Sequence, residues 1–145
     1  MKPKSPWFPQ AAPKRGETPP DGAWTTHLHR NAFGERRYNL YTPSAKPKRL
    51  RALLMMLHGC HQDADDFALG TRMWQWAERL GFAVVYPEQP YRANGANCWN
   101  WFLPSQQSSA GEEPSLLAEI ALSSIRSLEI DPRHIYVAGL SAGAS

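Results

Sequence analysis

Three short apolar segments alternate with helical segments along this chain, and this alternation restricts the fold more than any other feature. The segments cover residues 50–57, 82–86 and 134–140, and most of their positions are apolar. Strands without a polar side are typical of sheets that are covered on both faces. The helical segments between them supply the crossover connections that parallel strands need. The sequence therefore predicts an α/β fold with a mostly parallel sheet.

Two helices are predicted from the spacing of apolar side chains. Residues 63–80 carry apolar side chains near the helical repeat and are followed by Gly81. The first turn of this predicted helix holds three aspartates, Asp63, Asp65 and Asp66, and negative charge is favourable at a helix N-terminus. A metal site is not expected there, because no other cluster of ligand residues is spaced to join these aspartates. A second helix is predicted to open at Pro114, where a missing N–H costs nothing. Its buried stripe is formed by Leu116, Leu117, Ile120, Ile125 and Leu128.

The N-terminal part of the chain has a different pattern. Residues 24–30 and 36–42 loosely alternate apolar and polar side chains, and residues 31–34 between them contain turn formers, which predicts an antiparallel hairpin. Residues 1–23 hold six of the 13 prolines and few aliphatic side chains. Such a segment buries too little apolar area to offset its ordering entropy. We therefore predict a flexible arm over residues 1–23 and a folded part over residues 24–145.

Composition excludes several classes of protein. No apolar run approaches the roughly 18 residues of a membrane-spanning helix, so no membrane span is expected. No secretory signal is visible at the start, and the location of the protein is left open. The net charge of +3 comes from basic clusters in the arm and before the first apolar segment. No nucleic-acid-binding motif accompanies these clusters, so a solvated tail and turn account for them and no nucleic acid is expected as a partner.

The last apolar segment runs directly into Gly139-Leu140-Ser141-Ala142-Gly143, a Gly-x-Ser-x-Gly pattern. In this pattern the serine sits on a strained strand-to-helix turn, with its hydroxyl clear of the sheet. Gly139 and Gly143 lack the Cβ atoms that would collide around the turn. The N–H of Ala142, at the start of the helix, is placed to stabilise an oxyanion. The pattern predicts Ser141 as a nucleophile; the alternative is a tight packing turn with an incidental serine.

A second motif, His58-Gly59-Cys60-His61, follows the first apolar segment. In hydrolases with a Gly-x-Ser-x-Gly turn, the loop after this strand supplies the other oxyanion donor. That donor is predicted to be the backbone N–H of Cys60, with His58 and Gly59 completing the loop. Two alternatives stay open. These His and Cys side chains could ligate zinc together with Cys98, although at tighter spacing than usual, or they could form an ordinary strand-end turn.

Four segments in the same order resemble the polyhydroxybutyrate-depolymerase-like esterases, an α/β-hydrolase family that also includes feruloyl and acetyl-xylan esterases. They are Leu57-His58-Gly59-Cys60 with Gln62, Tyr86-Pro87-Glu88-Gln89, Cys98-Trp99-Asn100-Trp101-Phe102 and Val137-Ala138-Gly139-Leu140-Ser141-Ala142-Gly143. The resemblance implies an α/β-hydrolase-type sheet and hydrolysis of ester bonds, in polyester oligomers or acylated sugars, with no cofactor and no metal.

The resemblance also implies a disulfide between Cys60 and Cys98, which would pin the long loop beside the oxyanion turn. In a reducing cytosol both residues would instead be thiols. Within that loop, Trp99 and Trp101 are candidates for a platform that binds a sugar ring or polyester chain. The same aromatic side chains could equally form a lid over the core.

A serine nucleophile needs a histidine base and an acid, and in this fold both follow the serine along the chain. Only four residues follow Ser141 here. Our hypothesis is that residues 1–145 are the N-terminal half of a serine esterase, truncated after the nucleophile turn, inactive alone and dependent on a C-terminal half. Two other hypotheses are a non-catalytic module that binds acyl or sugar ligands and a serine acyltransferase.

Overall fold

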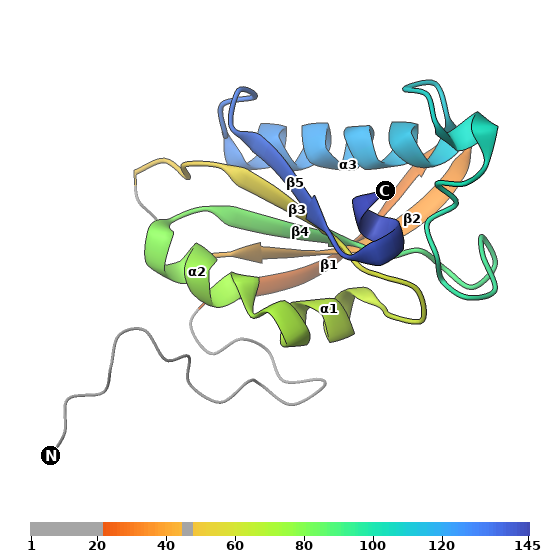
Figure 1. The fold of residues 1–145 in the computed structure, drawn as a ribbon. Coiled ribbons are helices and arrows are strands. Elements are labelled where there is room, and N and C mark those ends of the chain that lie inside the picture. Colours follow the sequence, from red (N-terminus) through yellow and green to blue (C-terminus); the bar gives the residue numbers. More distant parts are fainter. Residues whose placement is uncertain (1–21, 45–47) are drawn as a thin grey trace, which may run out of the picture.

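The computed structural model of the chain describes residues 22–44 and 48–145 (Figure 1). The predicted flexible arm over residues 1–23 therefore lies outside the described residues, except for its last two positions. Of these, Ala23 already begins the first strand, one residue before the predicted hairpin.

Five strands form one mixed sheet in the order β1-β2-β4-β3-β5. The first two form the predicted antiparallel hairpin, and β2 is also antiparallel to β4. The pairs β3–β4 and β3–β5 are parallel, as expected for strands joined by helical crossovers. The fold class is therefore confirmed, although only half of the pairings are parallel. The strands span Ala23–Asn31 (β1), Gly34–Thr42 (β2), Leu53–Leu57 (β3), Ala83–Pro87 (β4) and Ile135–Gly139 (β5).

Helices cover both faces of the sheet, as Figure 1 shows. One face is covered by α3 (Glu112–Leu128), and the other by α1 (Ala64–Thr71) and α2 (Met73–Leu80). Side chains of β4 alternate between the two resulting cores: Val85 belongs to the cluster that includes Ile120 of α3, and Val84 to the cluster that includes Phe67 of α1. Two 3₁₀ turns, η1 (Pro104–Gln106) and η2 (Ser141–Ala144), complete the described elements.

The prediction of one helix over residues 63–80 is wrong in one respect, because the helix breaks at Arg72. That residue adopts a left-handed conformation with φ of 51°, and its N–H donates to the carbonyl of Ala68 as a C-cap. The predicted N-terminus is present: the Asp63 side chain accepts a hydrogen bond of 2.8 Å from the N–H of Asp66. Gly81 caps α2 in the left-handed conformation, as predicted. Helix α3 begins at Glu112, two residues before the predicted Pro114.

The prediction that the third apolar segment is buried is also wrong. β5 is the outer strand of the sheet and pairs only with β3 within the described part of the chain. Helix α3 packs mainly against β1 to β4 and leaves most of β5 uncovered. As a result Tyr136 is 55% exposed and Val137 is 63% exposed. Apolar composition predicts a strand, but burial also requires neighbours on both faces.

The parallel strands β3, β4 and β5 all end at the same edge of the sheet, where ligand sites of α/β folds lie. The loops that leave this edge hold both motifs singled out from the sequence (Figure 1). No helix in the described residues is long and apolar enough to cross a bilayer.

Candidate active site

Ser141 lies on the sharp corner between β5 and η2. Its φ of 54° is in the left-handed region, which residues other than glycine rarely adopt, and the residue is exposed. The preceding Leu140 is still extended, and its N–H donates to the carbonyl of Leu57 at 3.1 Å. The chain therefore reverses direction within one residue, which is the strained strand-to-helix turn that the Gly-x-Ser-x-Gly pattern predicts.

The two glycines of the pattern are required by close backbone packing. A Cβ atom on Gly139 would lie 2.0 Å from the carbonyl oxygen of Gly143. A Cβ atom on Gly143 would lie 2.2 Å from the carbonyl oxygen of Leu57. Contacts this short do not occur between real atoms. Any other residue at 139 would force η2 away from β5, and any other residue at 143 would force it away from the end of β3.

Gly139→Ala is therefore expected to lower the free energy of unfolding by roughly 1–3 kcal/mol, the usual range for overpacking a fitted site. Gly70→Ala is the matched control, since Gly70 lies in α1 and a Cβ atom there meets nothing within 4 Å. The control should be neutral or stabilising by up to about 1 kcal/mol. Urea unfolding followed by circular dichroism measures both. Equal effects of the two changes would contradict the packing argument.

The loop after β3 lies against the serine turn. A Cβ atom on Gly59 would lie 3.5 Å from the Cβ of Ser141 and 3.4 Å from the carbonyl oxygen of Leu140. The N–H of Gly59 is held by the side-chain oxygen of Gln62 at 2.9 Å. Within the described ranges, the backbone N–H groups of Cys60 and Ala142 have no hydrogen-bond acceptor. The two predicted oxyanion donors therefore remain available.

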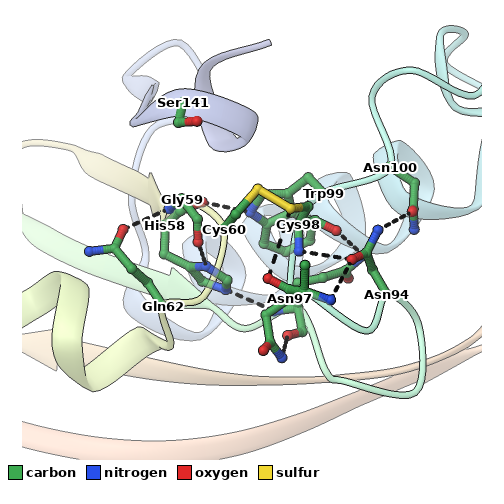
Figure 2. The surroundings of a disulfide bond; sticks show 12 residues. His58, Gly59, Cys60, Gln62, Asn94, Asn97, Cys98, Trp99, Asn100 and Ser141 are labelled. Carbon is green, nitrogen blue, oxygen red and sulfur yellow. Dashed lines mark hydrogen bonds between the residues drawn. A yellow bond between two sulfur atoms is a disulfide. The ribbon is translucent and has the colours of Figure 1, made fainter.

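A disulfide joins Cys60 to Cys98 across 38 positions of the chain, next to the serine turn (Figure 2). The same two segments are also joined by the N–H of His61, which donates to the carbonyl of Ala96 at 2.7 Å. In the structure these sulfur atoms are bonded to each other, so they are not available as the thiolates that the alternative zinc site would require. Among the described residues, no group of three or more His, Cys, Asp or Glu side chains is placed to hold a metal ion.

The two tryptophans of the long loop have different environments. Trp99 is only 4% exposed, and its indole N–H donates to the carbonyl of His58 at 3.1 Å. This buried position favours the alternative in which Trp99 covers the core, and it excludes Trp99 from a surface platform. Trp101 is 48% exposed and packs edge-to-face against Phe102, with ring centroids 5.9 Å apart. Trp101 therefore remains a candidate for contact with a substrate.

A buried polar cluster beneath the site was not predicted from the sequence. The amide of Gln89 donates to the carbonyl of Cys98 at 3.1 Å and to the carboxylate of Glu113 at the start of α3. The same carboxylate accepts the N–H of Asn100 at 2.8 Å and lies 3.9 Å from the guanidinium of Arg36. Burial lowers the pKa of Arg36, and the charges of Glu113 and its neighbour Glu112 oppose this shift. The cluster ties β2, β4, α3 and the disulfide loop together.

No histidine among the described residues is hydrogen-bonded to the hydroxyl of Ser141. Four of the five histidine rings have other partners. The two ring nitrogens of His58 are bonded to Gly59 and Gln89, His27 and His29 bond to Thr25 and Glu119 respectively, and the ring of His134 lies 3.9 Å from the carboxylate of Asp131. A base for Ser141 is therefore not assembled within the part of the chain that the structure describes.

Comparisons with known proteins agree on one group of enzymes. The model of a family described as esterase PHB depolymerase matches residues 36–145. Poly(3-hydroxyalkanoate) depolymerase C of Paucimonas lemoignei is 34% identical over 120 residues, which cover 77% of this chain and 28% of that protein. Acetylxylan esterase A of Emericella nidulans is 32% identical over 118 residues, which cover 77% of this chain and 37% of that protein. The chain thus spans well under half the length of these relatives.

A solved structure, the acetyl xylan esterase from Aspergillus awamori, has a TM-score of 0.68 with this chain at 20% identity. The superposition covers 82% of this chain and 43% of that one. This likeness confirms the fold, an α/β-hydrolase sheet whose described part ends shortly after the serine turn.

Proposed function

The chain belongs to the PHB depolymerase family of esterases, and on this premise we propose that Ser141 is the nucleophile of a carboxylic-ester hydrolase. The observation that carries the proposal is the corner at Ser141, where a non-glycine residue keeps a left-handed φ of 54° and an exposed side chain. Strained backbone of this kind persists where the surrounding structure enforces it, and it is characteristic of functional sites.

The proposed oxyanion hole is formed by the N–H groups of Cys60 and Ala142. Both groups lack an acceptor among the described residues, and Gly59, which precedes one of them, lies against Ser141. In the first step the oxygen of Ser141 attacks the ester carbonyl carbon and its proton passes to a base. The carbonyl oxygen becomes an oxyanion held by the two N–H groups, and the alcohol then leaves with a proton. Water cleaves the resulting acyl-enzyme.

The base and its acid are proposed to come from residues outside 1–145, because no described histidine contacts the serine hydroxyl. Residues 1–145 alone are then inactive. The substrates are proposed to be esters of hydroxyalkanoate oligomers or of acylated sugars, the two classes named for the relatives above. Trp101, which is exposed at the disulfide loop, is the proposed contact for one of these chains.

The proposal predicts a difference between two polypeptides. Residues 1–145 should hydrolyse p-nitrophenyl butyrate no faster than buffer, because a serine without a base is a poor nucleophile. The same residues, expressed with the coding sequence that follows them, should hydrolyse it and should react with a fluorophosphonate at Ser141. Spectrophotometry and peptide mass spectrometry are the measurements.

Two results would contradict this proposal. Hydrolysis by residues 1–145 that is lost in Ser141→Ala would show that a base is present within them. An inactive longer polypeptide, or a stop codon directly after Ser145, would favour a non-catalytic binding module.

A further inference from the structure

We propose that Glu113 is a positioning residue, which holds the turn that carries Trp101, the proposed contact for the substrate chain. The inference rests on the proposed function, since it concerns how the ester chain is held and not how its bond is cleaved. Glu113 is the second residue of α3 and is 5% exposed. A buried carboxylate requires hydrogen-bond donors around it. Of the three donors described for this one, two belong to Asn100 in the loop that follows Cys98.

The carboxylate of Glu113 binds Asn100 at two points. The backbone N–H of Asn100 donates to Oε2 at 2.8 Å, and its side-chain amide donates to Oε1 at 2.7 Å. Hydrogen bonds to a charged acceptor are roughly twice as strong as those between neutral groups. The side-chain oxygen of Asn100 also accepts from the amide of Asn94 at 2.9 Å. Both the backbone and the side chain of Asn100 are therefore fixed relative to α3.

Asn100 is the first residue of the turn that presents Trp101. The N–H of Leu103 donates to the carbonyl of Asn100 at 3.0 Å, which closes a turn over residues 100–103. Its two central residues, Trp101 and Phe102, are exposed and pack edge-to-face. The residue before the turn, Trp99, is buried in the core. The hold of Glu113 on Asn100 therefore fixes the point at which the chain leaves the core and turns an aromatic pair toward solvent.

This turn is close to the proposed oxyanion hole. The Cα atoms of Cys60 and Cys98 are 4.2 Å apart, and Trp101 follows Cys98 by three residues. Three residues span at most about 11 Å. In the view of Figure 2 the disulfide lies between the Ser141 corner and Asn100. An extended ester bound at Ser141 can therefore reach the turn, whereas a short ester such as p-nitrophenyl acetate ends before it.

A purely structural role for Glu113 would be to balance the buried charge of Arg36. The Nη2 atom of Arg36 lies 3.9 Å from the carboxylate of Glu113 and 3.6 Å from that of Glu112. Both distances are too long for a direct hydrogen bond, and Glu112 is the nearer of the two. The bonds from Asn100 are about 1 Å shorter. Glu113 therefore interacts more closely with the turn than with Arg36.

Glu113→Asp separates these two roles. It keeps the negative charge near Arg36, but its carboxylate is one methylene too short to hold Asn100. In the longer polypeptide we expect it to raise KM for a long ester by roughly fivefold to tenfold, the size of one lost aromatic contact, with kcat within about twofold. KM for p-nitrophenyl acetate should not change. Glu112→Asp is the matched control, because within the described ranges this neighbour has no hydrogen bond to the loop, and it should leave both KM values unchanged.

A double-mutant cycle tests whether Glu113 acts through Trp101. Trp101→Ala should raise KM for the long ester by a similar factor, and adding Glu113→Asp to it should have no further effect. The long probes are the methyl ester of the 3-hydroxybutyrate trimer and acetylated xylotriose, one for each proposed substrate class. Amide hydrogen exchange in residues 1–145 is a measurement that does not need activity. Exchange at Asn100 should be at least about tenfold faster in Glu113→Asp and unchanged in Glu112→Asp.

Three results would overturn the inference while the esterase proposal stands. They are additive effects of Glu113→Asp and Trp101→Ala, an equal loss of kcat with short and long esters, and a wild type that cleaves p-nitrophenyl acetate but neither long probe. The second of these is the result that a merely structural role would give. A wild type that is inactive on all three esters overturns the esterase proposal, and the exchange rate at Asn100 then still shows whether Glu113 holds the turn.

Discussion

Replacing Ser141 by alanine is expected to lower kcat/KM for ester hydrolysis by about 10⁴- to 10⁶-fold in the active polypeptide. The change removes the only atom of the side chain that can form the acyl-enzyme, and it leaves the backbone N–H groups of the proposed oxyanion hole in place. The residual rate then comes from binding and from stabilisation of the oxyanion during attack by water. Initial rates with p-nitrophenyl butyrate at several enzyme concentrations measure the loss.

The matched control is Ser127→Ala, which removes an exposed hydroxyl from α3. That hydroxyl donates only to the carbonyl of Ser124, three residues earlier in the same helix. Its loss should leave kcat/KM unchanged. Because alanine has a poorer fit to a left-handed φ than glycine, Ser141→Gly should be tested as well. It should be as inactive as Ser141→Ala and should retain the thermal midpoint. More than one hundredth of the wild-type rate in either Ser141 variant would assign the nucleophile to another residue.

The serine corner could be predicted from the sequence because its determinants are local. Gly139, Ser141 and Gly143 lie within five residues, and each acts on backbone that belongs to the corner or to the adjoining β3. The approach of the His58-Gly59-Cys60 loop could be expected for a related reason, since parallel strands end at one edge of the sheet. The resemblance to a known esterase family supplied the pairing of Cys60 with Cys98, which spacing alone does not give.

The buried polar cluster beneath the site could not be predicted, because the residues that form its hydrogen bonds are far apart in the sequence. Gln89 contacts His58 across 31 residues and Glu113 across 24 residues. A lone buried histidine or glutamate has no periodic signal, and its partner depends on the register between strands. The exposure of β5 was missed for a similar reason. Apolar residues at 135–140 identify a strand, whereas its place at the edge depends on the order of all five strands.

The break at Arg72 shows the limit of periodicity within a helix. Apolar spacing continues through residues 67–80, so one continuous helix fits the pattern as well as two do. Phe67 and Trp74 are buried in the same core cluster. Their spacing of seven residues would also place them on one face of a straight helix, so this pattern gives no signal for the left-handed residue between the two helices.

Removal of the disulfide is expected to be the largest stability change in this part of the chain. Cys60 and Cys98 close a loop of 38 residues, and on the chain-entropy model such a bridge stabilises the folded state by about 3–4 kcal/mol. This is a large share of the roughly 5–15 kcal/mol that separates folded from unfolded states of typical domains. The double change Cys60→Ala and Cys98→Ala should therefore lower the free energy of unfolding of residues 1–145 by that amount, measured by urea unfolding.

Reduction of the wild type by dithiothreitol is the matched control, because it opens the loop without changing a side chain. The reduced wild type and the double variant should unfold at similar urea concentrations, and dithiothreitol should have no effect on the variant. An unfolding free energy that is unchanged in both would contradict the bridge. The folded loop should persist at low urea, since the N–H of His61 also joins its two ends through a hydrogen bond to the carbonyl of Ala96. The disulfide then acts chiefly by restricting the unfolded chain.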